Sequence, residues 1–381
     1  MALAAVLALG ACGDQADDAR APAPPPPAAA DASPPEPLAQ GAAPPNPEPD
    51  DLYAATREGM LAPATADDPY RLYVPNSESD TVDVIDPERE EIIRSFPVGG
   101  LPQHVTPSYD LEKLYVNSNQ GNTLTTIDPA TGRPEGKPLD VEDPYNLYFT
   151  PDGNSAIVVA ERLQRLDFRD AETMKLEEQI QVPCEGVNHM DFAADGSYLI
   201  ASCEFGSALI KVDLERRELV GRLDLPQAGG MPQDVRVSPD GKVFYAADMA
   251  SNGVWQVDGE RFKVVDFLPT GEGAHGLYPS RDGARMYVSN RDEGTISVVD
   301  FETREVVDEW AIPGGGSPDM GGVSPDGDML WLTGRQNSEV YGFDTESGEL
   351  SARIPVGSGP HGMAVWPQPG RYSLGHTGNM R

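Results

Sequence analysis

Four of the five histidines in the chain recur at one point of a repeated sequence pattern, at His104, His189, His275 and His361. The matching positions of the intervening repeats are Asn146, Asp234 and Asp319. Imidazole is a ligand for Zn, Cu, Ni or Fe, and carboxylates and amides also suit Ca or Mn. If the fold brings these positions to one axis, the seven side chains form a candidate site for a divalent transition metal, for Ca or for another ligand. The fifth histidine, His376, has no counterpart in the repeats, and we assign it a structural role.

The register of the histidines leaves a second interpretation open. His189 lies six residues before Asp195, whereas His275 lies seven residues before Asp282. A shift of one residue sends a strand side chain to the opposite face of its sheet. Repeats copied from a common ancestor would also share a residue kept for packing or hydrogen bonding. The sequence therefore favours a structural or polar-channel role for the histidines, with a metal or ligand site as the alternative.

Charged loop residues follow a second recurring point of the repeat, where a strand ends. They are Glu204, Asp248, Arg291, Asp292 and Arg335. These side chains could surround the same end of a channel. The simpler interpretation is solvated loop charge, because connecting loops lie on the surface.

Two of the three cysteines, Cys184 and Cys203, flank a single hairpin whose turn is Asp195-Gly196. The turn folds both residues toward one end of the hairpin. In an exported protein a disulfide is the expected state, provided that the Cα atoms lie within about 7 Å. A pair of thiolate metal ligands beside His189 is the alternative.

The elements that position these residues are short strands in a repeat of about 43 residues. Asp-Gly pairs begin at positions 152, 195, 240, 282 and 326, with spacings of 43, 45, 42 and 44. Pro, Asp and Gly in this order suit a tight turn between two strands. Four β-rich runs follow one another in each repeat, and no helical pattern interrupts them. This pattern predicts an all-β fold of propeller blades.

Counting the repeats predicts seven blades. Residues 70–98 supply three strands without an inner one, six complete units follow, and residues 361–366 supply a lone inner strand. We expect that strand to complete the first blade, which closes the ring and protects open sheet edges.

Two segments, Tyr73-Val74-Pro75-Asn76 and Tyr287-Val288-Ser289-Asn290, are each one residue away from the signature of YVTN-repeat β-propellers. Residues 70–366 resemble that family, including its Pro-Asp-Gly turns and an inner strand like residues 360–365. The C-terminal residues 366–379 resemble those of a subset of exported bacterial propellers. The resemblance implies the propeller fold. It does not imply one function, since the family includes surface-layer proteins, nucleic-acid-associated proteins and relatives of haem-binding nitrite reductase propellers.

The first residues resemble a lipoprotein signal peptide, because an apolar run ends in Leu9-Gly10-Ala11-Cys12. No basic residue precedes the run, so we expect the start codon to lie upstream. Between Ala21 and Asp50, 12 of 30 residues are proline, a composition typical of a disordered, extended linker. We therefore expect a signal peptide at 1–11, the lipidated Cys12 with a disordered linker at 12–66, and the propeller at 67–381.

A net charge of −34 argues against nucleic acid as a partner. The sequence then supports two functions. The first is a lipid-anchored, extracytoplasmic and monomeric binding or scaffold module, with a cell-envelope protein, polysaccharide or small ligand as partner at the channel mouth. The second is a metal-dependent hydrolase, lactonase or oxidoreductase that uses the His and Asp residues; a haem in the channel is a variant, although no Cys-x-x-Cys-His motif exists to attach it. We expect the first function, in which no catalysis is needed.

Overall fold

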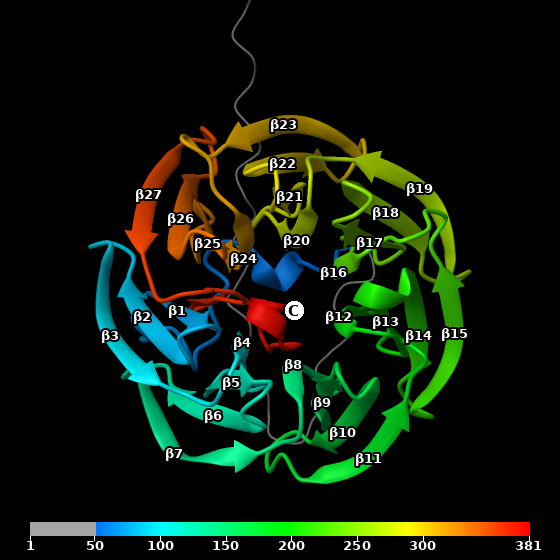
Figure 1. The fold of residues 1–381 in the computed structure, drawn as a ribbon, viewed down its shortest axis with the longest axis horizontal. Coiled ribbons are helices and arrows are strands. Elements are labelled where there is room, and N and C mark those ends of the chain that lie inside the picture. Colours follow the sequence, from blue (N-terminus) through cyan, green and yellow to red (C-terminus); the bar gives the residue numbers. More distant parts are fainter. Residues whose placement is uncertain (1–50) are drawn as a thin grey trace, which may run out of the picture. The chain divides into compact units, whose positions relative to one another are not determined.

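The computed structural model describes residues 51–381, which form seven four-stranded antiparallel sheets in a ring around a central channel (Figure 1). The predicted seven-bladed propeller is therefore confirmed. The expected signal peptide, Cys12 and the proline-rich stretch lie outside the described residues. We number the blades along the chain, so that blade 1 contains β1–β3 and blade 7 contains β24–β27.

Each blade has four strands, arranged side by side in order from the channel to the rim. The inner strands are β4 (Pro102–Pro107), β8 (Pro144–Phe149), β12 (Val187–Phe192), β16 (Pro232–Val237), β20 (Ala274–Pro279), β24 (Pro318–Val323) and β28 (Ala364–Trp366). The second strands are β1 (Arg71–Asn76), β5 (Leu114–Ser118), β9 (Ser155–Ala160), β13 (Tyr198–Cys203), β17 (Val243–Asp248), β21 (Arg285–Asn290) and β25 (Met329–Gly334).

The remaining strands complete the outer half of every blade. The third strands are β2 (Thr81–Asp86), β6 (Thr123–Asp128), β10 (Arg165–Asp170), β14 (Ala208–Asp213), β18 (Gly253–Asp258), β22 (Thr295–Asp300) and β26 (Glu339–Asp344). The outer strands are β3 (Glu91–Pro97), β7 (Arg133–Asp140), β11 (Leu176–Gln181), β15 (Glu218–Asp224), β19 (Lys263–Pro269), β23 (Glu305–Ala311) and β27 (Leu350–Pro355). Three short 3-10 helices are η1 (Ala54–Thr56), η2 (Glu204–Gly206) and η3 (His376–Gly378).

The Asp-Gly pairs form the predicted turns between inner and second strands. In blade 5 the Ser238 hydroxyl donates to Asp240 Oδ1 at 2.6 Å, and the Lys242 backbone N–H donates to the same oxygen at 3.2 Å. Gly241 follows with a φ of +71°, which glycine adopts without steric cost. These turns mark one end of the channel, the turn end. The inner strands begin at the opposite end, the mouth.

The two ends of the propeller sequence meet in blade 1. Strand β28 pairs antiparallel with β1, with Leu72 opposite Val365 and Tyr73 opposite Ala364. The expected closure of the ring is therefore confirmed, and blade 1 has the same four-stranded order as the other six.

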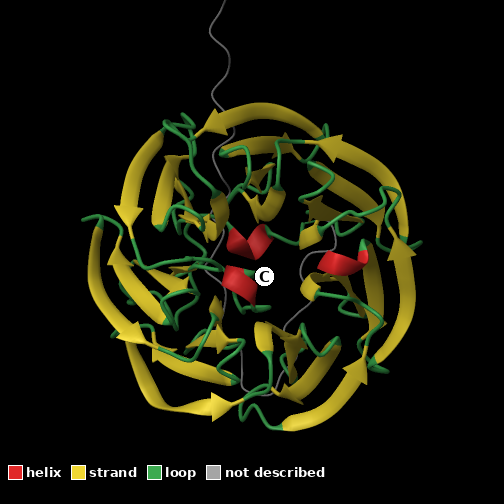
Figure 2. Ribbon diagram, in the orientation of Figure 1, coloured by secondary structure: helices red, strands yellow, loops and turns green. Residues whose placement is uncertain are grey.

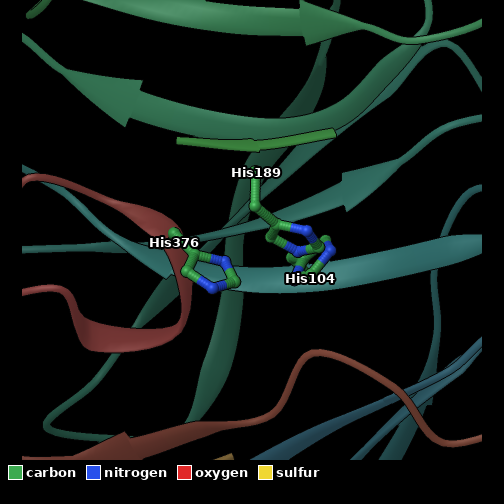
Figure 3. A group of neighbouring side chains, drawn as sticks. All are labelled: His104, His189 and His376. Atoms are coloured by element: carbon green, nitrogen blue, oxygen red, sulfur yellow. The ribbon is translucent and has the colours of Figure 1, made fainter. Parts of the chain in front are cut away.

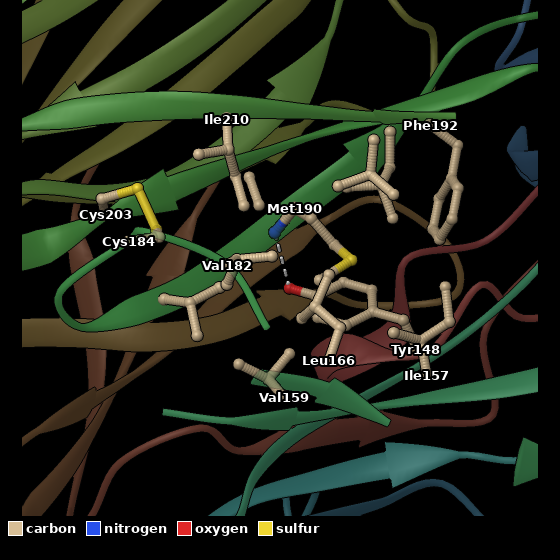
Figure 4. Close-up of a cluster of buried hydrophobic side chains, with 14 of the residues drawn as sticks. Tyr148, Ile157, Val159, Leu166, Val182, Cys184, Met190, Phe192, Cys203 and Ile210 are labelled. Atoms are coloured by element: carbon tan, nitrogen blue, oxygen red, sulfur yellow. Dashed lines mark hydrogen bonds between the residues drawn. A yellow bond between two sulfur atoms is a disulfide. The ribbon is translucent and has the colours of Figure 1, made fainter. Parts of the chain in front are cut away.

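Neighbouring blades pack through large apolar side chains between their sheets. Between blades 3 and 4, the Met190 backbone N–H donates to the Tyr148 hydroxyl at 3.1 Å and joins the two inner strands (Figure 4). The same cluster contains a disulfide between Cys184 and Cys203, whose Cα atoms lie 5.0 Å apart. The predicted disulfide is confirmed, so these sulfurs are not thiolate metal ligands.

Residues 51–66, which the sequence analysis places in the linker, pack on the turn end of the propeller. The Leu52 N–H donates to the Pro239 carbonyl at 2.8 Å, and the Tyr53 hydroxyl donates to the Val237 carbonyl at 2.7 Å. Leu52 and Tyr53 are 1% and 3% exposed. The folded part of the chain therefore includes residues 51–66, because this short segment carries apolar side chains that cover the turn end.

The C-terminal residues 367–381 enter the channel from the turn end, and the chain terminus lies near the centre of the ring (Figure 1). Helix η3 lies beside the axis, with η1 next to it in the same view (Figure 2). Inside the channel, the Phe149 N–H donates to the Leu374 carbonyl at 2.9 Å. The chain then turns back, and Arg381 forms an ion pair with Asp191 at 2.7 Å.

Within residues 51–381, no helix has the length and hydropathy needed to span a membrane.

Candidate functional site

All five histidines converge on the channel axis. The ring centroid of His104 lies 5.2 Å from that of His189, 4.9 Å from that of His361 and 5.2 Å from that of His376. His275 joins the cluster at 5.9 Å from His361. All five residues are 0–3% exposed. The structure thus brings the four repeat histidines together and adds His376, for which the sequence analysis expects only a structural role.

The offset between histidines that the sequence shows is real and divides the site into two layers. Met190 pairs with Ala201 and Leu277 pairs with Val288, so Met190 and Leu277 hold equivalent positions in their blades. His189 directly precedes Met190, whereas His275 lies two residues before Leu277. By the same pairing the predicted residues separate into a mouth layer of His275, Asp319 and His361 and a deep layer of His104, Asn146, His189 and Asp234.

The deep layer presents imidazole nitrogens to one another (Figure 3). His104, His189 and His376 each offer a nitrogen, and these three atoms lie within 4.8 Å of one another. Both ring nitrogens of His104 and both of His189 have no hydrogen-bond partner among the described residues. Leaving a buried polar group unpaired costs about 1–3 kcal/mol, so four such atoms on two neighbouring rings favour an additional partner.

His376 is carried into the deep layer by the tip of the C-terminal segment. The Asn146 amide N–H donates to its Nδ1 at 3.1 Å, while its Nε2 lies 3.4 Å from Asp234 Oδ1. His376 and Thr377 have positive φ angles of 34° and 22°. Such a conformation is unfavourable for a β-branched residue and is typically found where the surrounding structure enforces it for function.

The mouth layer is built around the buried carboxylate of Asp319. His361 Nδ1 lies 2.7 Å from Asp319 Oδ2, and His275 Nδ1 lies 3.1 Å from Oδ1. The Arg291 guanidinium donates to Asp319 and contacts His275 Nε2. Arg335 NH1 lies 3.8 Å from the same carboxylate. Here every charge has an opposite charge beside it.

The electrostatics of the two layers follow from burial and from these partners. Burial lowers the pKa of all five histidines, that of His361 to about 4, so the rings are neutral at pH 7. Burial by itself would raise the pKa of Asp319, but Arg291 and the two imidazoles hold it well below its usual range. A neutral imidazole is the form that binds a metal ion.

The loop residues that follow the second strands surround the mouth. Going around the ring from blade 1, these seven positions hold Ser77, Asn119, Glu161, Glu204, Met249, Arg291 and Arg335. The acids lie in adjacent blades 3 and 4, and the arginines lie in adjacent blades 6 and 7. The mouth therefore has an acidic side and a basic side.

Glu161 was missed by the sequence analysis, although it holds the same position in blade 3 as Glu204 does in blade 4. Burial, together with Glu204 and Asp143, raises the pKa of Glu161 to about 8. The Asn188 amide donates to Glu204 at 2.7 Å, whereas the Glu161 carboxyl makes no hydrogen bond or ion pair among the described residues. Aligning the second-strand ends of all seven repeats would have found it.

The other charged loop residues do not belong to the site. Asp248 is buried and accepts hydrogen bonds from Trp255 Nε1 at 2.9 Å and from Ser251 at 2.8 Å. It stabilises its own blade. Asp292 is exposed, as expected for a solvated loop residue.

Residues 52–369 match the family model of the YNCE-like beta-propellers. The chain belongs to this family. The resemblance to YVTN-repeat propellers seen in the sequence is thereby confirmed, since the YNCE-like family is one of these. No curated protein sequence matches the chain.

Several solved structures have a similar fold at low sequence identity. A functionally unknown protein from Desulfotomaculum acetoxidans has a TM-score of 0.65 at 16% identity, over 77% of this chain and 98% of that one. The dihydro-heme d1 dehydrogenase NirN in complex with DHE has a TM-score of 0.61 at 17% identity, over 84% and 82%. Hydrazine synthase from Kuenenia stuttgartiensis has a TM-score of 0.59 at 17% identity, over 77% and 98%. Proteins of such different roles share only the fold with this chain.

Proposed function

We propose that the chain is a lipid-anchored, extracytoplasmic binding module that takes a small zwitterionic ligand at the mouth of its channel. The observation that carries this proposal is the separation of charge around the mouth. Glu161 and Glu204 lie on one side, and Arg291 and Arg335 lie on the other. A ligand with an ammonium group at one end and a carboxylate at the other would match both sides at once.

The charges on the two sides of the mouth influence one another. Arg335 lowers the pKa of both Glu161 and Glu204, although burial raises each pKa more strongly. The Arg335 side chain is 30% exposed, and its contact with Asp319, at 3.8 Å, is too long for a hydrogen bond. Its N–H groups are therefore available to another anion. The Glu161 carboxyl makes no hydrogen bond or ion pair within residues 51–381, and an arriving ammonium group would favour its ionised form.

Calorimetry with ω-amino acids of increasing chain length tests this function. We expect binding to be tightest at one chain length, the length that best matches the distance across the mouth. The corresponding alkylamines and alkyl carboxylates should bind at least about tenfold more weakly, since each satisfies one side. Binding at pH 7 should release a proton, because Glu161 is protonated when free.

Two variants identify the site, and two control for general charge effects. Glu161→Gln and Arg335→Gln should each weaken the best ω-amino acid by about tenfold or more. Glu339→Gln and Arg353→Gln remove an ion pair on the outside of blade 7, 2.9 Å in length, and should leave binding unchanged. Absence of binding across the whole series, or equal binding of the singly charged compounds, would contradict the proposal.

The membrane anchor is a separate part of the proposal. It is supported by the lipobox-like Leu9-Gly10-Ala11-Cys12 and by the Cys184–Cys203 disulfide, which is typical of an oxidising compartment. Cys12→Ser should move the protein from the membrane fraction to the soluble extracytoplasmic fraction. Retention of this variant in washed membranes would show that Cys12 is not the anchor.

A further inference from the structure

We infer that His104, His189 and His376 form a binding site for one divalent transition-metal ion, with the third ligand supplied by the C-terminal segment. This site is independent of the zwitterion site proposed above. It lies one residue deeper along the inner strands, beneath the mouth layer. Its ligands come from blade 2, blade 4 and the tip of residues 367–381 (Figure 3).

The first argument is the chemistry of the three side chains. The four ring nitrogens of His104 and His189 make no hydrogen bond within residues 51–381, and all three residues are fully buried. A buried cluster of imidazoles whose N–H donors and lone pairs lack partners is not stabilising by itself. A metal ion supplies the missing partner to several nitrogens at once, and three imidazoles suit Zn, Co, Ni or Cu rather than Mg or Ca.

Second, the distances between the three ligand nitrogens are compatible with one ion. The three nitrogens lie within 4.8 Å of one another. In a tetrahedral zinc site, with Zn–N distances of about 2.0–2.1 Å, ligand nitrogens are separated by about 3.3 Å. Each nitrogen therefore has to move inward by less than about 1 Å, which a small rotation of the side chain provides.

The third argument is that neighbouring residues hold the ligands in place. The His189 backbone N–H donates to the Ser202 hydroxyl oxygen at 3.1 Å, and this hydroxyl donates to the His189 carbonyl at 3.3 Å. The His104 ring covers Gly362, where a Cβ would lie 1.9 Å from Nδ1. Asn146 donates to His376 Nδ1, so Nδ1 bears the lone pair that an ion can take, while the Nε2–H of the neutral ring faces Asp234 Oδ1 at 3.4 Å. Such outer contacts orient metal ligands in proteins.

The other two histidines lie in the mouth layer, one residue nearer the mouth than His104 and His189, and share one carboxylate with Arg291. His275 and His361 both lie against the Asp319 carboxylate, at 3.1 Å and 2.7 Å. The ligand set therefore differs from the four repeat histidines that the sequence suggests. It replaces His275 and His361 with His376, and Asp234 is the nearest carboxylate, 3.4 Å from His376 Nε2.

Cobalt titration of the full chain tests the site. Protein purified without a polyhistidine tag is treated with a chelator, dialysed and titrated with Co²⁺, with visible absorption and metal analysis as readouts. We expect one Co²⁺ per chain and displacement by Zn²⁺. His104→Gln, His189→Gln and His376→Gln should each lower the affinity at least about 100-fold.

His275→Gln and His361→Gln are the matched controls, because both residues lie in the same cluster but outside the proposed ligand set. They should leave Co²⁺ affinity within about threefold. Loss of affinity in these two variants together with normal affinity in His376→Gln would overturn the assignment.

A second measurement guards against variants that fail to fold. Zn²⁺ added to the unmodified, chelator-treated protein should raise its melting temperature, since an ion that binds only the folded state stabilises it. No Co²⁺ binding and no Zn²⁺-dependent shift would overturn the site and mean that solvent satisfies the imidazoles. Calorimetry of ω-amino acids on chelator-treated protein tests the mouth separately, so either proposal can fail alone.

Discussion

The mouth layer and the deep layer contain the same kind of side chain but compensate it in different ways. In the mouth layer, His275 and His361 share the Asp319 carboxylate with Arg291. In the deep layer, His104 and His189 have no hydrogen-bonding partner for their ring nitrogens among the described residues. Both layers are buried to the same degree, so burial alone does not distinguish them.

In a repeat protein, the hydrogen-bond and ion-pair partners of clustered histidines therefore have to be assigned separately for each layer of side chains. Where a carboxylate and a guanidinium lie beside the ring, they already supply partners for its buried nitrogens. Where the rings face one another without such partners, an external ligand is the simplest source of compensation. A one-residue offset between repeats decides which of these two environments a histidine occupies.

The largest expected effect comes from removing the charge that organises the mouth layer. Asp319→Asn should lower the free energy of unfolding by about 3–5 kcal/mol, because it leaves the partly buried Arg291 guanidinium and two buried imidazoles without their carboxylate. His104→Leu, in the chelator-treated protein, should cost at most about 1 kcal/mol, since no hydrogen bond is lost. Urea unfolding of both variants measures the contrast, and equal losses would show that the two layers do not differ.

The next effect concerns the segment that only the deep layer depends on. A Cβ at Gly375 (φ +95°) would lie 2.3 Å from the Leu147 carbonyl oxygen, whereas one at Gly314 (φ +84°) would have no atom within 4 Å. Gly314→Ala should cost about 1 kcal/mol because of its positive φ, and Gly375→Ala about 2 kcal/mol more through overpacking. Thermal unfolding compares them. Only Gly375→Ala should also weaken Co²⁺ binding.

A smaller effect is the dependence of stability on pH in the metal-free protein. The buried histidines have folded-state pKa values below their unfolded value, which is about 6.5. The unfolded chain therefore binds more protons, and stability falls as the pH drops below about 6.5. For His361 this loss ends at its folded pKa of about 4.

The variant His104→Gln/His189→Gln isolates the contribution of the deep layer to this pH dependence. Between pH 7 and about 5.5 it should lose about 2 kcal/mol less stability than the unmodified protein, because two titrating groups are gone. Urea unfolding at several pH values gives the slope. An unchanged slope would mean that these imidazoles are already protonated in the folded state.

The smallest effect is at the rim of the mouth. The raised pKa of Glu161, about 8, means that the folded state keeps a proton that the unfolded state loses above about pH 4.5. The protonated Glu161 carboxyl therefore lowers the stability of the folded state progressively as the pH rises from about 4.5 to about 8. Glu161→Gln should raise the melting temperature by about 2 °C at pH 8.5 and by less at pH 5. A decrease at pH 8.5 would show that the ionised carboxyl is stabilised.

The sequence was sufficient for the fold because its signals are local and repeated. Asp240-Gly241 and its four counterparts mark the turns, and the lone strand before Trp366 reveals the closure with β1. The Cys184–Cys203 pair could be predicted because a single hairpin brings both residues to one end. None of these inferences needs knowledge of contacts between distant segments.

The candidate site was predicted only where it follows the repeat. His104, His189, His275 and His361 were found by their recurrence, but their six- and seven-residue offsets suggested opposite sheet faces rather than the two layers that the structure has. His376 was missed because its position depends on a segment that folds back through the channel, which no periodicity describes. Gly375 and Gly378, which flank it, were the available signal, since both have positive φ angles.

The pairing of β28 with β1 has a consequence for how the chain acquires its structure. Until the last inner strand has formed, β1 presents unsatisfied backbone groups along its channel side, and such an edge readily pairs with other chains. Contacts between residues so far apart in sequence also form slowly. The first blade to be synthesised is thus the last to be completed, and protection of that edge in the interval is a requirement that this topology places on the cell.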